Sequence, residues 1–315
     1  MWVFEEKING RNLTELINTE HENVKYLPGI RLPKNLIADP DIKHTVKDSD
    51  LIIFNIPHQF LRNICKQLDG VDFGRTRAIS CLKGLNVSKD GVLLLSDYIK
   101  QNLGIHCGVL SGANLAPEVA AEKYSETTIA YPQPADHFEG DINHDILKLL
   151  FQRQYFHVRV SPDTAGVSIG GALKNVVAIG AGMVEGAGWG DNAKAAIMRR
   201  GLIEMIKFGT TFFPDCQMST FTHESAGVAD LITSCAGGRN VRVGREFIKT
   251  GAKSIREVET ELLNGQSAQG IDTTRDVYEL LSERNMTKEF PLFTAIYLIC
   301  FKNYKVDDLP ALLQE

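Results

Sequence analysis

Short runs of β-branched and aromatic residues alternate with amphipathic stretches from the N-terminus to about residue 161. Strands joined by helices in this way are typical of a mostly parallel, doubly wound sheet, so the first half of the chain is predicted to be an α/β domain. The pattern predicts strands at 2–4, 51–56, 77–81, 108–110, 127–131 and 156–160, and helices at 59–68 and 92–102.

After Pro162 the strand signals stop, and the chain shows helical periodicity with capping residues such as Asp163 and Asp191. An all-helical second domain is therefore predicted, with domains at 1–161 and 162–315. In such architectures the ligand lies at the carboxyl ends of the strands, facing the second domain. The helices expected there span 165–182, 193–208, 276–284 and 291–304.

Composition and charge exclude several classes of protein. The 315 residues are 43% hydrophobic and 23% charged, which suits two globular domains. A net charge of -5 argues against binding to nucleic acid or to an anionic membrane. No charge-free apolar run reaches the ~18 residues of a membrane span, since Lys174 interrupts the longest one. Six scattered cysteines without a C-x-x-C pair indicate reduced thiols and argue against a metal site.

A lysine and an asparagine, Lys174 and Asn175, lie in a helix otherwise built from Gly, Ala, Val and Ile. A buried lysine is costly unless it is paired or partly neutral, and burial lowers its pKa toward the range in which it exchanges a proton. The alternative is a side chain that extends to solvent. The neighbouring motifs favour the first interpretation.

A second motif runs from Glu224, a carboxylate expected within an apolar helix, through Asp230 to Gly237-Gly238-Arg239-Asn240. Paired glycines let backbone N–H groups approach a ligand, and the Arg239 guanidinium suits a phosphate. The alternative is a glycine turn followed by a solvated arginine.

Loops after predicted strands can line the same cleft. Lys83 follows the strand at 77–81, and a turn of small residues at 111–114 opens a helix whose N-terminal amides favour anions. Phe60 follows another strand and can border a flat ring, although simple packing is the alternative. His58 has no metal-ligand spacing and is interpreted as structural.

In combination, these residues resemble the cytosolic, eukaryotic type of NAD-dependent glycerol-3-phosphate dehydrogenase. The resemblance covers the whole chain in order. It is carried by the motifs at 1–6 (MWVFEE), 55–60 (NIPHQF), 81–84 (CLKG), 110–114 (LSGAN), 171–178 (GALKNVVA), 227–233 (GVADLIT), 235–240 (CAGGRN) and 262–266 (LLNGQ).

The resemblance implies a Rossmann-like domain and reversible reduction of dihydroxyacetone phosphate to glycerol 3-phosphate by NADH, in a cytoplasmic homodimer. It implies that Lys174 is the proton donor and acceptor, with Asn175 and Asp230 beside it. The substrate residues carried over are Lys83, Arg239 and Asn240, and the residues carried over for NAD are Phe4, Phe60, Ala116, Arg239 and Gln269.

One departure concerns the family's first strand and its G-x-G-x-x-G turn, which receives the pyrophosphate. The chain starts at what resembles the second strand, and Gly10, Gly29 and Gly70 are isolated. The expectation is a sheet domain that lacks its first strand and binds NAD poorly. Two alternatives therefore stay open: a weakly active or inactive member that acts as a regulatory or dimerising partner, and a two-domain dehydrogenase of the hydroxyacid type.

Overall fold

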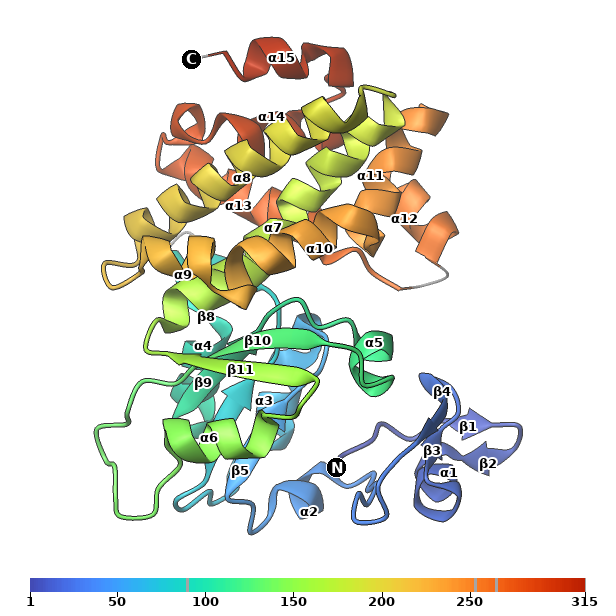
Figure 1. Ribbon diagram of the computed structural model, residues 1–315, viewed down its shortest axis with the longest axis vertical. Helices are drawn as coiled ribbons and strands as arrows, with labels where there is room; N and C mark the ends of the chain where they lie inside the picture. Colours follow the sequence, from blue (N-terminus) through green and yellow to red (C-terminus); the bar gives the residue numbers. More distant parts are fainter. Residues whose placement is uncertain (89–90, 252–253, 264–265, 315) are drawn as a thin grey trace.

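The computed structural model describes residues 1–88, 91–251, 254–263 and 266–314. A mostly parallel sheet with its own helices forms one half of the molecule, and a bundle of helices forms the other (Figure 1). The last strand of the sheet ends at Ser161 and the first helix of the bundle begins at Thr164. The fold class predicted from the sequence, a Rossmann-like sheet domain followed by a helical domain, is confirmed.

The central sheet has five strands in the order β11-β10-β9-β6-β5. All neighbouring pairs are parallel except β9 and β10, which are antiparallel. The strands are β5 (Leu51–Phe54), β6 (Arg77–Ser80), β9 (Cys107–Ser111), β10 (Ser125–Ala130) and β11 (Phe156–Ser161), each overlapping a predicted run.

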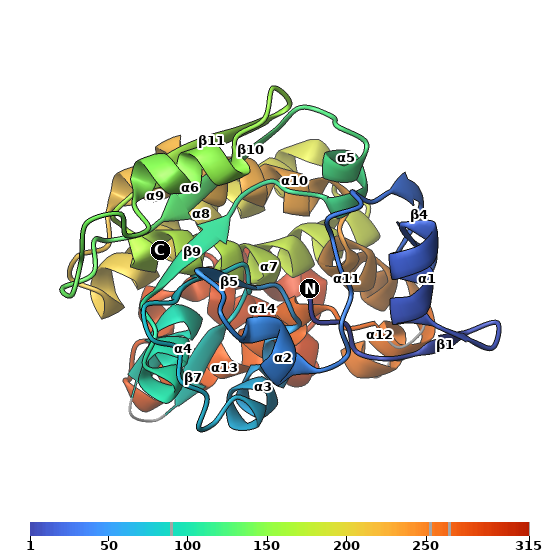
Figure 2. The same ribbon diagram turned by 90° about the horizontal axis from the view of Figure 1, so that it is seen from below.

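Alternate side chains of each strand face different helices. On β6, Ala78 packs in a core with α3 (Leu61–Gln67) and α4 (Leu95–Leu103), whereas Ile79 packs with α6 (His144–Phe151) on the other face. Figure 2, seen from below, shows α3 and α4 together and α6 across the sheet from them. The sheet is covered on both faces, as its apolar strands require.

Two sequence predictions in this half need correction. Residues 2–4 are not a strand of the sheet, because Trp2 makes only a bridge to Asp39 within an N-terminal segment that packs around Leu13 and Ile17. The predicted helix 92–102 is confirmed from Leu95 onward as α4, but its first three residues belong to the hairpin strand β8 (Gly91–Leu94), which pairs with β7 (Leu85–Ser88). A short apolar run can form either a helix or a strand, so pairing with a neighbouring strand decides which of the two it forms.

The N-terminal segment and the loops contain the remaining short elements of this half. They are β1 (Lys7–Ile8), β2 (Arg11–Asn12), α1 (Leu13–Glu20), β3 (Glu22–Asn23), β4 (Leu27–Arg31), α2 (Ile42–Val46), the 3-10 turn η1 (His58–Phe60) and α5 (Ala116–Ala120).

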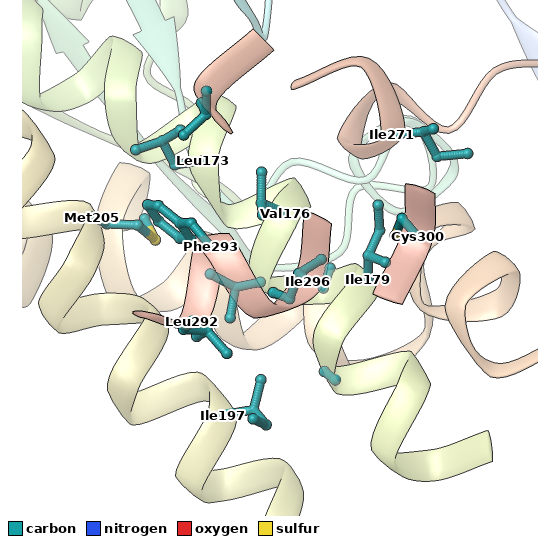
Figure 3. Close-up of a cluster of buried hydrophobic side chains, with 14 of the residues drawn as sticks. Leu173, Val176, Ile179, Ile197, Met205, Ile271, Leu292, Phe293, Ile296 and Cys300 are labelled. Atoms are coloured by element: carbon teal, nitrogen blue, oxygen red, sulfur yellow. The ribbon is translucent and has the colours of Figure 1, made fainter. Parts of the chain in front are cut away.

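The long helix α7 (Thr164–Gly186) forms the centre of the helical domain. Asp163 caps its N-terminus, accepting from the Gly166 amide at 2.8 Å and from the Thr220 hydroxyl at 2.6 Å. Apolar side chains of α7 interlock with those of the surrounding helices (Figure 3). By length and composition α7 is the one described helix able to cross a membrane, a test that core helices also meet, and its apolar stretch is 100% buried in the protein.

Helices pack around α7, except where it faces the sheet domain. Glycines let one of them, α11 (Arg239–Thr250), approach closely: a Cβ at Gly182 would lie 2.2 Å from the Val241 carbonyl oxygen, and one at Gly244 would lie 2.4 Å from that of Ile179. The other elements are α8 (Gly190–Phe212), α9 (Met218–His223), the π-helical turn η2 (Ser225–Ala229), α10 (Asp230–Gly237), α12 (Ile255–Leu263), α13 (Gln269–Glu283), η3 (Thr287–Glu289), α14 (Pro291–Phe301), η4 (Val306–Asp308) and α15 (Leu309–Leu312).

Candidate active site

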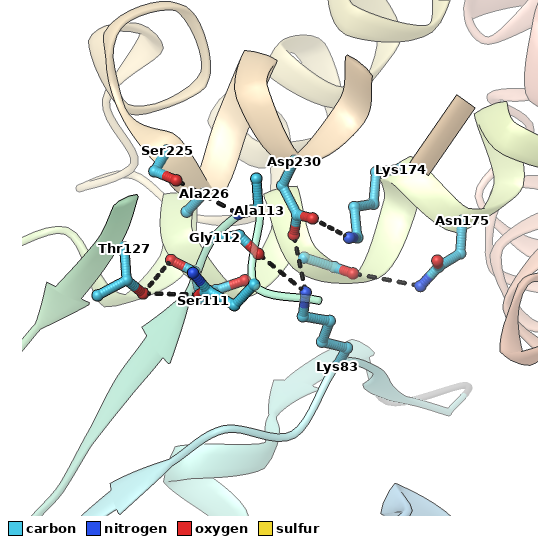
Figure 4. Close-up of polar contacts among 12 residues, drawn as sticks. Lys83, Ser111, Gly112, Ala113, Thr127, Lys174, Asn175, Ser225, Ala226 and Asp230 are labelled. Atoms are coloured by element: carbon cyan, nitrogen blue, oxygen red, sulfur yellow. Dashed lines mark hydrogen bonds and ion pairs between the residues drawn. The ribbon is translucent and has the colours of Figure 1, made fainter. Parts of the chain in front are cut away.

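Three charged side chains meet where the sheet domain faces α7. Lys174 lies in the middle of α7, Asp230 is the first residue of α10, and Lys83 lies in the loop between β6 and β7. One carboxylate oxygen of Asp230 contacts the Lys174 ammonium, and the other accepts from Lys83 Nζ at 2.9 Å (Figure 4). The side chain of Lys174 is 5% exposed, that of Asp230 3% and that of Lys83 29%. Lys174 therefore does not extend to solvent.

The electrostatics of this cluster favour proton exchange by Lys174. Burial is the main reason that the pKa of Lys174 falls to about 7; the Asp230 carboxylate opposes the fall and the Lys83 ammonium adds to it. A general acid or base is most effective when its pKa lies near the working pH. Because two lysines share one carboxylate, the site also keeps a positive charge that an anion can approach.

A second polar cluster joins three helices beside Lys174. Asn240 Nδ2 donates to Asn175 Oδ1 at 2.9 Å, and Asn240 Oδ1 accepts from the Gly270 amide at 2.9 Å. The network connects α7 and α11 to the start of α13, where Gln269 is the first residue. Arg239, the first residue of α11, is exposed next to Asn240. Substrate and cofactor residues predicted from separate motifs thus lie on adjoining helix ends.

The remaining predicted cofactor residues lie in loops and at a helix end. Phe60 ends η1 after β5 and is 53% exposed, and Ala116 is the exposed first residue of α5 after β9. Phe4 lies outside the sheet, in the N-terminal segment, and is 74% exposed. Of the motif at 262–266, Asn264 and Gly265 lie outside the described residues.

One expectation about these loops is wrong and another stays a prediction. The turn at 111–114 is followed by a helix as expected, the five-residue α5, and the Ala113 amide of the turn donates to the Ser225 hydroxyl. Binding of an anion by the first amides of α5 stays a prediction. Glu224 is not in a helix: its backbone is extended after α9, and its carboxylate pairs with Arg159 at 3.2 Å. The irregular turn η2 follows Glu224 and leads into α10.

A cavity of about 250 Å³ lies between the loop after β5 and α13. His58, Arg62, Tyr98 and Asp276 are among its lining residues, whereas Lys174 and Asp230 are not. The cluster of Lys174, Asp230 and Lys83 is more relevant to chemistry than this cavity, because a buried lysine with a lowered pKa is the rarer feature.

A doubly wound sheet domain whose strand ends face a buried lysine on a helical domain is typical of a two-domain dehydrogenase. Comparisons with known proteins narrow the class. The family model described as NAD-dependent glycerol-3-phosphate dehydrogenase N-terminus matches residues 1–136, and the model of the C-terminus matches residues 163–311.

Individual relatives agree along the whole chain. The chain is 62% identical to NAD(+) glycerol-3-phosphate dehydrogenase 1 of Yarrowia lipolytica, over 99% of this chain and 79% of that protein. It is 60% identical to the mitochondrial NAD(+) glycerol-3-phosphate dehydrogenase 2 of Saccharomyces cerevisiae, over 100% of this chain and 72% of that protein.

Solved structures give the same result. The glycerol-3-phosphate dehydrogenase structure from Saccharomyces cerevisiae is 59% identical with a TM-score of 0.94, covering 100% of this chain and 90% of that one. The Plasmodium falciparum enzyme is 38% identical with a TM-score of 0.92, covering 100% and 86%. The chain belongs to the NAD-dependent glycerol-3-phosphate dehydrogenase family, eukaryotic type.

The family match bears on the remaining expectations. Because the N-terminal family model matches from residue 1, the prediction that the domain lacks its first strand is not borne out. The match also favours an enzyme over an inactive partner, and this family over a hydroxyacid dehydrogenase.

Family membership implies NAD as the cofactor. The residues present fit such a group at the strand ends. Phe60 offers an exposed ring there, and Ser111 Oγ, at the end of β9, is buried without a hydrogen-bond partner among the described residues.

Sequence reasoning gave no role to Ser225 or Gly270, which position residues of this site. Neither carries a charge, and their roles depend on contacts with distant parts of the chain. Only the small size of Gly270 is a signal in the sequence. Such a signal becomes specific only when the close neighbour is known.

Proposed function

We propose that this chain interconverts sn-glycerol 3-phosphate and dihydroxyacetone phosphate, with NAD as the cofactor and Lys174 as the proton donor and acceptor. The observation that carries the proposal is the buried contact of Lys174 with Asp230, which Lys83 shares. This contact supports a role for Lys174 in proton exchange, in a positively charged site beside the start of α11.

Side chains of the protein donate and accept the proton. NAD, when bound, accepts or supplies the hydride. In the direction of ketone reduction, the Lys174 ammonium stabilises the oxygen as negative charge develops there and gives it a proton. In the direction of alcohol oxidation, neutral Lys174 takes the hydroxyl proton. Asp230 orients the amine, and Lys83 contacts the substrate and holds the pKa of Lys174 down.

Binding of the phosphate falls to the start of α11. Arg239 supplies a guanidinium that suits a phosphate dianion, and Asn240, fixed by Asn175 and Gly270, supplies a polar neighbour. Holding this remote group fixes the reacting carbon in place relative to Lys174. For the cofactor we propose Phe4, Phe60, Ala116, Arg239 and Gln269.

We further propose that residues 1–161 bind NAD, that residues 162–315 bind the substrate, and that the enzyme is a cytoplasmic homodimer. Six free cysteines, five of them buried, support a reducing compartment. The homodimer is proposed on the family resemblance. Light scattering of the purified protein tests the dimer, and fractionation of cells tests the compartment.

The deciding experiment follows NADH consumption by the purified chain with dihydroxyacetone phosphate and, separately, with unphosphorylated dihydroxyacetone. We expect turnover with the phosphorylated ketone and at least about 100-fold lower kcat/KM without the phosphate, because its charged hydrogen bonds are lost. Equal turnover of both ketones would reject the phosphate site, and no turnover of either would reject the activity.

A further inference from the structure

A single peptide unit connects the lysine cluster to a serine in the helical domain. The carbonyl of Gly112 accepts from Lys83 Nζ at 3.2 Å, and the N–H of Ala113, which belongs to the same peptide bond, donates to Ser225 Oγ at 3.3 Å. Figure 4 shows the contact of Ala113 with Ser225 and the contact of Gly112 with Lys83, which in turn contacts Asp230. In a planar trans peptide the C=O and N–H point in opposite directions, so orienting one orients the other.

Ser225 itself is held firmly. Its side chain is buried, and its hydroxyl donates to the Glu126 carbonyl of β10 at 2.7 Å while it accepts from Ala113. Each role of the hydroxyl is therefore used, and its direction is determined. Gly112 allows this approach, because a Cβ there would lie 2.8 Å from Ser225 Oγ.

The same serine opens the irregular turn that leads to Asp230. Ser225 is the first residue of η2, where Gly227 has φ -95 and ψ -108, outside the helical range, and η2 ends directly before Asp230. Such π-helical turns often occur at functional sites. Ser225 thus joins the strand-end turn that holds Lys83 to the segment that presents Asp230, the partner of both lysines.

We propose that Ser225 is a positioning residue for the dehydrogenase reaction: it orients the Gly112–Ala113 peptide so that the Gly112 carbonyl keeps the Lys83 ammonium against Asp230 and close to Lys174. The inference rests on the proposed role of Lys174. It adds a residue that touches neither lysine and acts on both through one backbone unit.

The consequence for proton exchange has a definite direction. The groups that face Lys174 are Lys83, Asp230 and the Cys235 thiol, whose own pKa burial raises to about 12, so that it stays neutral. Without the Ser225 hydroxyl, the Gly112–Ala113 peptide can rotate, so that the Gly112 carbonyl no longer holds Lys83. Lys83 then moves away from Asp230, and the Asp230 carboxylate pairs with Lys174 alone. Less repulsion and more attraction both raise the pKa of Lys174.

The test is the pH profile of single-turnover oxidation of glycerol 3-phosphate by NAD, a direction that needs neutral Lys174. For Ser225→Ala we expect a rate about tenfold lower near neutral pH, the loss that one hydrogen bond can cause. We also expect the rising limb of the pH profile to shift to higher pH by about half a pH unit or more. Ser225→Thr, which keeps the hydroxyl, is expected to restore the limb.

The control is Ser168→Ala on α7, which removes another buried hydroxyl, bonded only to the Thr164 carbonyl among the described residues, and is expected to leave the profile in place. A purely structural role for Ser225 would lower the rate equally at every pH. An unmoved or lowered limb in Ser225→Ala therefore overturns the proposal. If that variant does not fold, Ser225→Cys replaces it with the same expected upward shift, and an unmoved limb overturns the proposal equally.

A variant of Lys174 separates this inference from the function on which it rests. If Lys174→Met keeps the rising limb at an unchanged rate, the proposed role of Lys174 is wrong. If Lys174→Met abolishes turnover while Ser225→Ala leaves the limb unmoved, only the role of Ser225 is wrong.

Discussion

Lys174 and Asp230 form an ion pair that the fold removes almost completely from water, with side chains 5% and 3% exposed. Burying two charges costs several kcal/mol of desolvation per ion, which their mutual attraction must offset. Replacing such a pair with apolar residues often leaves the stability of the fold unchanged or raises it. Stability therefore does not account for this pair. A lysine whose pKa is close to neutrality, held beside a second cation, is better explained by proton exchange.

Replacing Lys174 with methionine is expected to lower kcat by about 10² to 10⁴-fold, the usual contribution of a positioned acid or base. Methionine keeps an apolar side chain of similar length, so the core around α7 stays filled, and Asp230 keeps Lys83 as its partner. The measurement is steady-state kinetics in both directions with a melting curve for each protein. A folded variant with normal kcat would contradict the assignment.

Replacing Arg239 with alanine is expected to raise KM for dihydroxyacetone phosphate by about 10- to 100-fold, the cost of losing charged hydrogen bonds to phosphate. Arg242, also exposed on α11, provides a matched control with the same change of charge. KM values for the two variants give the answer. Equal KM values would show that Arg239 does not bind the phosphate.

Local patterns predicted the parts of the fold that local forces determine. The strand β6 and the capped start of α7 depend on neighbouring residues, and both were predicted to within a few residues. The hairpin of β7 and β8 was missed because pairing, and not the apolar run of 92–102, decides its structure.

The site shows the same division. Lys174 was identified because a charged residue among apolar neighbours in a helix can be recognised from the few residues on either side of it. Ser225 was not, because its partner Ala113 lies 112 residues away and a serine hydroxyl has many local partners available. Contacts of this kind depend on the assembled domains, so a single sequence contains no local trace of them.

Gly270→Ala is expected to weaken binding of both the phosphorylated ketone and NADH. A Cβ at this position would lie 2.5 Å from the Asn175 carbonyl oxygen and 2.7 Å from Asn240 Oδ1, so α13 must shift, and Gln269 and Asn240 with it. The measurements are KM for the ketone and NADH fluorescence titration. Ser282→Ala, at the exposed far end of α13, is the control. Normal values for both ligands in Gly270→Ala would disprove the coupling.

Glu204 makes the stability of the helical domain depend on pH. This buried carboxylate on α8 accepts from the Leu292 and Phe293 amides, at 2.6 and 2.9 Å, and so caps α14. Burial nevertheless raises its pKa from 4.5 to about 7, against the effect of both amides. The folded state therefore binds a proton more tightly than the unfolded chain. The resulting stabilisation is fully present below about pH 4.5 and is lost as the pH rises through about 7.

Glu204→Gln removes that loss, since glutamine does not ionise. Relative to wild type, the free energy of unfolding of the variant is expected to rise by up to about 3 kcal/mol between about pH 5 and 8, whatever offset the lost acceptor causes at low pH. Titration of Lys174 changes the free energy of unfolding of both proteins equally, so it cancels from the difference between them. Urea unfolding at a series of pH values measures the difference, with exposed Glu279→Gln as the control. A difference that stays constant across this range would mean that Glu204 remains charged in the folded protein, with the α14 amides outweighing its burial.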